Sequence, residues 1–220
     1  GGKNASLGEM FTALAPAGIR VPDGFAATAD AWRLFLADNR LDGKLRQTLA
    51  LLDTRTLGNL AEVGAACRTL VAGGKLPAPV TEAVLDAYAR LDPHRSLSMA
   101  VRSSATAEDL PTASFAGQHD SFLNVSGDDA LLAAVLRCYV SLFNDRAIKY
   151  RIDNGFDHMQ VALSVGVQRM VRADLGSAGV AFTLDPESGN DQVVYITGAW
   201  GLGENIVQGA VNPDEFHVFK

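Results

Sequence analysis

Apolar residues at helical spacing dominate the first 92 positions of the chain. The first stretch of this kind has its apolar face at Leu7, Met10, Phe11 and Leu14. Asn4 or Ser6 is suited to be the N-cap of this helix, which the pattern starts just after Lys3. A helix is therefore predicted close to the beginning of the chain, with a lysine beside its first turn.

The next residues combine a short alternating segment with several helices. Residues 18–27 alternate apolar and polar side chains around a Pro-Asp-Gly turn, and helical spacing resumes in AWRLFLADN. Residues 41–92 then hold three more amphipathic stretches, LDGKLRQTLALLD, LGNLAEVGAACRTLVAGG and APVTEAVLDAYARLD. Residues 28–95 are predicted to be a mainly helical insert.

From about residue 97 the pattern indicates strands. SMAVR reads as a buried strand that ends near Val101, FLNV as a short strand, and DDALLAAVLRCYVSLFNDRAIKYRIDNG as one long helix with an apolar stripe for the core. Four strand-like runs follow, VALSVGVQRMV, SAGVAFTLD, QVVYITGAWG and DEFHVFK, separated by turn residues. Residues 96–220 therefore form a strand-rich lobe.

Together these elements predict an α+β fold with a helical insert, a mainly antiparallel sheet and a ligand between the lobes. The chain has 220 residues, of which 48% are hydrophobic, so one large domain or two small ones can bury a real core. Both ends look cut, at a glycine-rich start and directly after a strand. The chain is interpreted as a truncated domain.

Composition excludes several classes of protein. The formal charge of −6 and the lack of a Lys/Arg cluster argue against nucleic acid as a partner. No apolar run is long enough for a membrane span, and the start lacks the features of a signal peptide. Cys67 and Cys138 have no metal-type spacing and fall in helical stretches, which indicates buried free thiols in a reducing compartment. A cytoplasmic protein is expected.

Residues 100–125, AVRSSATAEDLPTASFAGQHDSFLNV, carry the strongest candidate chemistry. Arg102 follows the predicted strand, where its guanidinium offers fixed donors to a phosphate or carboxylate. Gly117 allows a close backbone approach. Hydroxyl donors come from Ser103, Ser104 and Thr106. The alternative is a structural ion pair of Arg102, for which Glu108 and Asp109 are available partners; these two acids are equally suited to orient a phosphate or Mg²⁺.

The start of the chain offers a second cation. GGK lacks the spacing of a Walker loop, but a helix beginning directly after it supplies free backbone N–H groups, and Lys3 adds a mobile charge. The alternative is a solvent-exposed loop lysine. Lys3, Arg102 and Arg169 are the local positive groups that can hold a small anionic ligand on an acidic protein.

The segments GGKNASLGEM and AVRSSATAED resemble the nucleotide-binding domain of the phosphoenolpyruvate synthase (pyruvate, water dikinase) family, and the resemblance runs from Gly1 to Lys220. This family is related to pyruvate, phosphate dikinase and to rifamycin phosphotransferase. The resemblance implies an ATP-grasp-like fold. It also implies that Lys3 and Arg102 bind ATP phosphates and that Gly117 and Ser121 are further nucleotide contacts; relatives often carry Thr at the position of Ser121.

The resemblance also places the base. VALSVGVQRMV is similar to the strand leading to the adenine hinge of ATP-grasp proteins, where Gln168 is the candidate amide and Met170 is a candidate to pack on the ring. The alternative is a glutamine on an exposed strand face. AWGLGENIVQG supplies a second glycine-rich loop near the nucleotide, with Gly201, Gly203 and Glu204 as the residues of interest.

The implied reaction converts ATP, pyruvate and water into phosphoenolpyruvate, AMP and phosphate through a phosphohistidine. Arg102 is the candidate catalytic residue, and the cofactors are ATP and Mg²⁺. The metal ligands of the family, near a VQARPE-like motif, are expected after Lys220. None of His94, His119, His158 and His217 has the context of the phosphorylated histidine, so a separate swivelling domain and the pyruvate-binding barrel are expected in the missing part of the parent chain.

Two other functions stay open at this stage. Rifamycin phosphotransferase shares the GGK and AVRSSATAED motifs, although SLFNDRAIKYR, AWGLGENIVQG and AVNPDEF favour phosphoenolpyruvate synthase. A noncatalytic nucleotide sensor is the third reading. The isolated chain is expected to bind ATP weakly without turnover, and a homodimer is left open.

Overall fold

The computed structural model describes residues 2–105, 109–110, 113–114 and 120–220. Its internal contacts divide the chain into two compact units, Gly1–Met170 and Val171–Lys220. Each unit is described by itself. The predicted contributions of Thr106, Glu108 and Gly117 fall outside the described residues, and so does His119.

The first unit combines helices with a sheet. Its helices are α1 (Gly2–Leu14), α2 (Ala29–Asp38), α3 (Asp42–Leu49), α4 (Leu60–Ala72), α5 (Ala78–Leu91), α6 (Asp128–Ser141) and α7 (Asp145–Asp153), with a 3-10 turn at Ala15–Ala17. Its strands are β1 (Gly24–Ala27), β2 (Met99–Ala105), β3 (Asp109–Leu110), β4 (Ala113–Ser114), β5 (Ser121–Val125) and β6 (Leu163–Arg169). The amphipathic stretches predicted between residues 29 and 92 are thus confirmed as α2 to α5.

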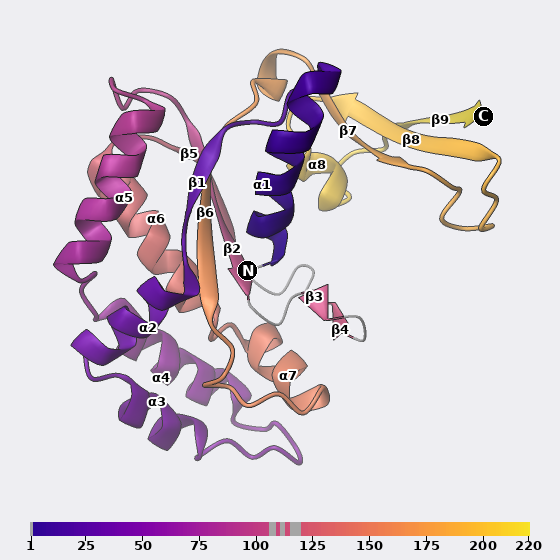
Figure 1. Ribbon diagram of the computed structural model, residues 1–220. Helices are drawn as coiled ribbons and strands as arrows, with labels where there is room; N and C mark the ends of the chain where they lie inside the picture. The colour runs from indigo at the N-terminus through magenta and orange to yellow at the C-terminus, as the bar shows by residue number, and fades with distance from the viewer. Residues whose placement is uncertain (1, 106–108, 111–112, 115–119) are drawn as a thin grey trace. The chain divides into compact units, whose positions relative to one another are not determined.

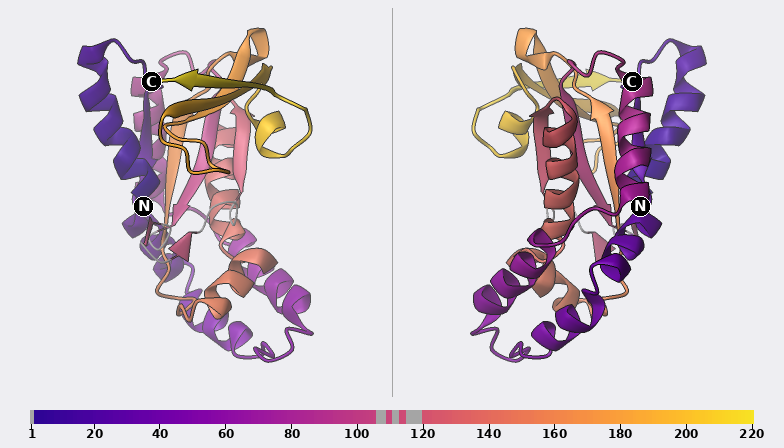
Figure 2. Two further views of the ribbon diagram at one scale, coloured as in Figure 1. Left: turned by 90° about the vertical axis from the view of Figure 1, so that its right-hand side faces the viewer. Right: turned by 90° about the vertical axis from the view of Figure 1, so that its left-hand side faces the viewer.

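The sheet has the strand order β1-β6-β2-β5, and every described strand pair in it is antiparallel (Figure 1). The last strand in sequence, β6, therefore lies inside the sheet, between the first strand and the second. Helices α2, α5 and α6 lie along one face of this sheet and α1 lies along the other (Figures 1 and 2). Because side chains alternate between the faces of a strand, each strand contributes to both environments.

The core lies between the sheet and α2, α5 and α6. Alternate residues of β6, namely Leu163, Val165 and Val167, point into it and are almost fully buried. An aromatic cluster extends it: Trp32 and Phe35 of α2 contact Tyr139 of α6, with ring centroids 5.0 and 5.2 Å apart. Burial of these faces is the main stabilisation of the unit.

The remaining helices pack beyond one end of the sheet, where α4 contacts α3, α6 and α7 (Figures 1 and 2). Arg68 of α4 ties this group together, because its Nη1 donates to Asp145 Oδ1 at 2.6 Å and to the carbonyl of Phe143 at 2.7 Å. Cys67 and Cys138 are free and buried, as the sequence predicted.

The predicted single helix over residues 128–155 is wrong. It breaks into α6 and α7 at Leu142 to Asn144, where backbone N–H groups bond three residues back in a tightened turn. Asn144 adopts an extended backbone with φ −61° and ψ 143° and begins the second helix. Asn144, directly before Asp145, is a residue type that favours the start of a helix. This local preference for a new helix outweighs the apolar periodicity, which predicts one continuous helix.

The predicted ends of two other elements are also corrected. Strand β2 continues through Ala105 instead of ending near Val101, because its pairing with β6 extends to Ala105 and Leu163. Helix α1 begins at Gly2, so Asn4 and Ser6 lie inside the helix and neither is the N-cap. The apolar face of α1 is not buried: Met10 is 40% exposed and Phe11 is 44% exposed.

The second unit is a small antiparallel sheet of order β7-β8-β9, formed by Ser177–Phe182, Val193–Trp200 and Asp214–Phe219. It also contains a 3-10 turn at Ala173–Leu175 and the short helix α8 at Glu204–Val207. The four strand-like runs of the sequence are confirmed as β6 to β9.

The predicted α+β class with a mainly antiparallel sheet is confirmed. None of the helices among the described residues is both long enough and apolar enough to cross a lipid bilayer.

Candidate functional site

The sheet face that lies against α1, here called the α1 face, carries small and polar residues. Register and alternation assign to it Gly24 and Ala26 of β1, Ser164, Gly166 and Gln168 of β6, Ala100, Arg102 and Ser104 of β2, and Ser121 of β5. Apart from Arg102 and Gln168, these are glycine, alanine or serine. The opposite face of the same strands carries the core, so one sheet separates an apolar interior from a surface suited to a polar ligand.

Three of the residues singled out in the sequence, Arg102, Ser121 and Gln168, lie on this face. Gly166 pairs with Arg102 on the neighbouring strand, and Arg102 pairs with Ser121 on the strand beyond it. These residues form one row across the sheet, since paired residues share a face. Gln168 lies in the next row, opposite Ala100. The antiparallel topology thus brings together residues 121 and 168 around Arg102.

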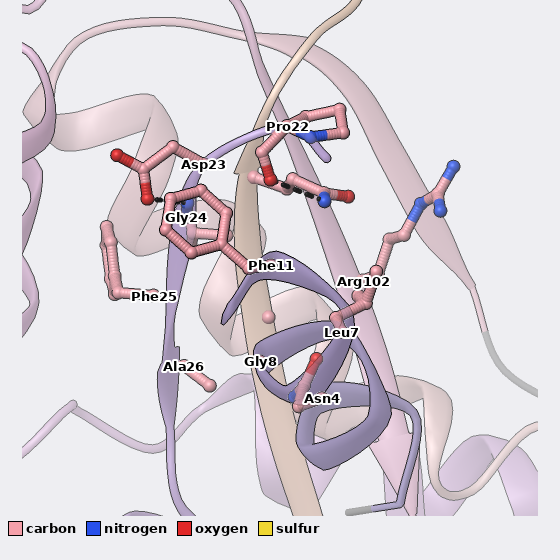
Figure 3. Close-up of a pocket in the computed structure, with 13 residues that line it drawn as sticks. Asn4, Leu7, Gly8, Phe11, Pro22, Asp23, Gly24, Phe25, Ala26 and Arg102 are labelled. Carbon is pink, nitrogen blue, oxygen red and sulfur yellow. Dashed lines mark hydrogen bonds between the residues drawn. The ribbon is translucent and has the colours of Figure 1, made fainter. Parts of the chain in front are cut away.

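A pocket of about 370 Å³ lies between α1 and the sheet (Figure 3). Helix α1 contributes Asn4, Leu7, Gly8 and Phe11, and the sheet side contributes Pro22 to Ala26, Arg102 and Gly166 to Gln168. Figure 3 shows Arg102 beside α1, on the other side of the pocket from Asp23. The lining combines apolar rings with a few polar groups, as small-molecule sites do.

Arg102 is exposed in the middle of β2 rather than after its end. The ion pairs found among the described residues do not include Arg102. The side chains of its suggested partners, Glu108 and Asp109, lie outside the described part of the chain, so the alternative of a structural ion pair is not tested. An exposed guanidinium on a face of small residues is sterically accessible to an anion from several directions.

Gln168 is half-buried and oriented by a backbone contact. Its Nε2 donates to the carbonyl oxygen of Pro22 at 2.8 Å (Figure 3). This bond fixes the side chain and leaves the amide oxygen and the second N–H for another partner. Gln168 is therefore held in place at the pocket rather than mobile on an exposed strand face.

Ser104 is the one residue of the α1 face whose hydroxyl is buried without a partner among the described residues. The side chain is 1% exposed, and its Oγ makes no hydrogen bond there. It lies opposite Ser164 in the register. Buried hydroxyls are nearly always bonded, so the unpaired Ser104 Oγ departs from the usual pattern.

Lys3 lies in the first turn of α1, not in a loop before it. The next residue, Asn4, binds the sheet: its Nδ2 donates to Ser164 Oγ at 2.8 Å, and Ser164 Oγ donates to the carbonyl of Ala27 at 2.9 Å. The beginning of α1 is thereby attached to β6 and to the end of β1.

Several candidates are not brought to this site. Arg169 lies on the opposite face of β6 from Gln168, and its Nη2 donates to the carbonyl of Leu91. Gly201 and Gly203 precede the short helix α8, and Glu204 is exposed, with its Oε1 accepting from Gln208. They belong to the second unit, so their predicted nearness to a nucleotide stays a prediction.

The sequence reasoning missed Ser164 and Gly166 and assigned Asn4 only as a cap. Ser164 and Gly166 alternate along β6 with the core residues Leu163, Val165 and Val167. Ser164 and Gly166 follow the period of two within VALSVGVQRMV, and this signal identifies them as the non-core face of the strand.

A sheet with a helical core layer on one face and, on the other, polar residues around a pocket beside α1 is the setting of a small-ligand domain. The chain belongs to the family described as "Pyruvate phosphate dikinase, AMP/ATP-binding domain", which matches residues 1–220. Among curated proteins it is similar to phosphoenolpyruvate synthases of Escherichia coli K12 (55% identity), Pseudomonas aeruginosa (56%) and Neisseria meningitidis (54%). Each comparison covers 100% of this chain and 28% of the relative, so the chain spans little more than a quarter of those proteins.

Proposed function

We propose that this chain is the ATP-binding part of a phosphoenolpyruvate synthase. Such an enzyme converts ATP, pyruvate and water into phosphoenolpyruvate, AMP and phosphate through a phosphohistidine. Family membership and identities of 54–56% over the whole chain support the proposal. The observation that carries it is the α1 face, where Arg102, Ser121 and Gln168 meet beside a pocket.

The phosphates would bind along the row that contains Arg102. Its guanidinium is a permanent charge with several donors, and Ser121 places a hydroxyl on the paired position. Lys3 and the backbone N–H groups of the first turn of α1 add positive potential. Gly117, the remaining predicted contact, lies outside the described residues.

The base would bind at the Gln168 end of the pocket. The amide of Gln168, fixed by Pro22, matches the donor and acceptor pattern of an adenine edge. Leu7, Phe11 and Phe25 supply apolar surface for the ring. Met170, the last residue of the first unit, is half-buried directly after this strand.

In catalysis the chain would position the polyphosphate and compensate charge as the phosphoryl group leaves. Arg102 is the residue proposed to do so, since a fixed cation stabilises developing negative charge without reorganisation. Mg²⁺ would neutralise further phosphate charge in such a reaction. Among the described residues no group of three or more acidic, His or Cys side chains gathers, so no protein ligand is assigned to it here. No step is derived through the metal.

The phosphoryl acceptor and pyruvate would be supplied by other parts of the parent protein. His158 accepts a hydrogen bond from a buried arginine, and His217 contacts the ring of Tyr195 in the second unit. His158 is not among the residues of the α1 face. A swivelling phosphohistidine domain and a pyruvate site are therefore proposed as partners within the intact protein.

Phosphorus NMR of the intact protein with ATP and Mg²⁺ tests the reaction. Phosphoenolpyruvate, AMP and phosphate should appear only when pyruvate is added. AMP and phosphate that appear only with a rifamycin would establish the antibiotic enzyme instead. No consumption of ATP under either condition would contradict both enzymes and favour a nucleotide sensor.

The site is tested by Arg102→Ala, with Arg33→Ala as the matched control. Arg33 is an exposed arginine on α2 that forms a local ion pair with Asp30, three residues before it. Arg102→Ala should reduce turnover on the order of a hundredfold or more, whereas Arg33→Ala should leave it unchanged. A nucleotide sensor would lose affinity without any turnover to lose, and equal activity of both variants would refute the assigned role.

A further inference from the structure

We propose that Asn4 is a positioning residue that holds the first turn of α1, and with it Lys3, over the α1 face. This inference rests on the proposed function, because the ligand that Lys3 would contact is ATP. It adds a residue that acts through its neighbour rather than by touching the nucleotide.

Helix α1 has little apolar packing to fix its position. None of its residues is buried, and Met10 and Phe11 are each 40% exposed or more. The face of β6 beneath it offers Ser164, Gly166 and Gln168 rather than large apolar side chains. A helix with so small a buried area depends on specific polar contacts for its orientation.

Asn4 makes such a contact. Its Nδ2 donates to Ser164 Oγ at 2.8 Å, where the serine is 2% exposed. The Ser164 Oγ–H donates its hydrogen bond to the carbonyl of Ala27, so towards Asn4 the hydroxyl can only accept. The contact requires a donor at position 4, and a carboxylate in place of the amide would lack one.

The sheet is also shaped for this side chain. A Cβ at Gly166 would lie 2.4 Å from Asn4 Oδ1 and 3.2 Å from its Cγ, so the amide occupies the space that a side chain at 166 would fill. Gly166 pairs with Arg102. The Asn4 amide therefore lies against the row of the sheet that contains Arg102, the residue proposed to bind phosphate. By holding the first turn of α1 there, Asn4 would fix the position of Lys3 relative to Arg102.

The first test is a double-mutant cycle on ATP affinity in the intact protein, with Asn4→Ala, Lys3→Ala and the pair. Asn4→Ala should raise the Kd for ATP about tenfold, and it should add nothing once Lys3 is removed. Thr12→Ala, an exposed change on the same helix, is the control and should have no effect. An Asn4→Ala effect that persists in the Lys3→Ala background would overturn the positioning role.

A second variant tests the contact itself. Gly166→Ala should displace the Asn4 amide and raise the Kd as Asn4→Ala does, and Asn4→Ala with Gly166→Ala together should be no worse than Asn4→Ala alone. Circular dichroism verifies that each variant folds. Additive losses in the pair would contradict the shared cause.

The two proposals fail separately. If the unmodified protein does not bind ATP, or if Lys3→Ala leaves its affinity unchanged, the proposed function of this site is wrong. If Lys3→Ala weakens ATP binding and Asn4→Ala does not, only the positioning role is wrong.

Discussion

The Nε of Arg151 donates a hydrogen bond of 2.9 Å to Nδ1 of His158, and this bond joins α7 to the turn that precedes β6. Arg151 is fully buried, and its Nη1 and Nη2 have no partner among the described residues. Since Nδ1 accepts, His158 must be neutral with its proton on Nε2. Burial lowers the pKa of Arg151 to about 10. Burial and the charge of Arg151 together lower the pKa of His158 to about 4, against the opposing effect of Asp157.

This pair makes stability depend on pH. The folded pKa of His158 lies below its ordinary value of 6.5, so the unfolded chain binds a proton that the folded chain does not. The neutral histidine contributes its full stability above pH 6.5, and the contribution is lost as the pH falls from about 6.5 to about 4. His158→Gln keeps an acceptor for Arg151 without titrating. Urea unfolding at pH 7 and pH 5 should show wild type losing about 2 kcal/mol more than His158→Gln. Equal losses would contradict the assignment.

Gly24 is required for the approach of β1 to β6. A Cβ there would lie 2.3 Å from the carbonyl oxygen of Val167, a backbone atom that cannot turn aside. Gly24→Ala should lower the free energy of unfolding by about 1–3 kcal/mol. Gly43→Ala, in α3 with open space around it, should raise that free energy by about 0.5–1 kcal/mol because alanine favours the helix. Denaturant unfolding compares the two, and effects of the same sign would be inconsistent with this explanation.

Arg68 links α4 to α7 with two hydrogen bonds from one nitrogen. Because it satisfies a backbone carbonyl as well as Asp145, Arg68→Ala should cost about 1–2 kcal/mol of unfolding free energy. Arg33→Ala removes an exposed local pair and should cost at most about 0.5 kcal/mol. If thermal or chemical unfolding shows that Arg68→Ala and Arg33→Ala lower the free energy of unfolding equally, the hydrogen bond from Arg68 to Phe143 does not stabilise the fold.

The two cysteines should be unreactive in the folded chain. Burial raises the pKa of Cys67 to about 11, and burial likewise raises the pKa of Cys138. A thiol-reactive chromophore at pH 8 should therefore label neither until denaturant is added, and then label both. Rapid labelling of Cys138→Ala under native conditions would show that Cys67 is accessible.

The isolated 220-residue chain should bind ATP with an affinity weaker than micromolar and should not turn it over. Its described residues provide no cluster for a metal ion, and it spans 28% of its relatives. Isothermal titration with ATP and Mg²⁺ measures this. A micromolar Kd would show that residues 1–220 form a complete site by themselves.

Most elements of the fold could be predicted from periodicity, but their limits could not. The helices α2 to α5 and the strands β6 to β9 follow patterns of apolar residues, which reflect burial on one face. The break between α6 and α7 was missed because Leu142 and Phe143 continue the apolar stripe through it. The end of β2 was missed because Ser103 and Ser104 look like loop residues, whereas pairing with β6 holds them in the sheet.

The site was only partly predictable for a related reason. Arg102 and Gln168 stand out by residue type, but the register that places them on adjacent strands depends on contacts between distant segments. Asn4 and Gly166 carry no motif signal that separates a helix contact from a cap or a turn. Their roles follow from the 2.8 Å hydrogen bond between Asn4 and Ser164 and from the space that the absent Cβ of Gly166 leaves for the Asn4 amide. Both are contacts between distant parts of the chain, which only the folded structure shows.

The interior place of β6 in the sheet also constrains how the protein is made. Gln168 contacts Pro22 across 146 positions of sequence, and β6 pairs with both β1 and β2. During synthesis β1 and β2 emerge long before β6, and until β6 is made each has an unpaired edge where β6 will pair. Closing such distant contacts is slow. A chain that stops before Leu163 therefore leaves the strand edges that β6 would pair with exposed, and exposed strand edges favour association with other chains.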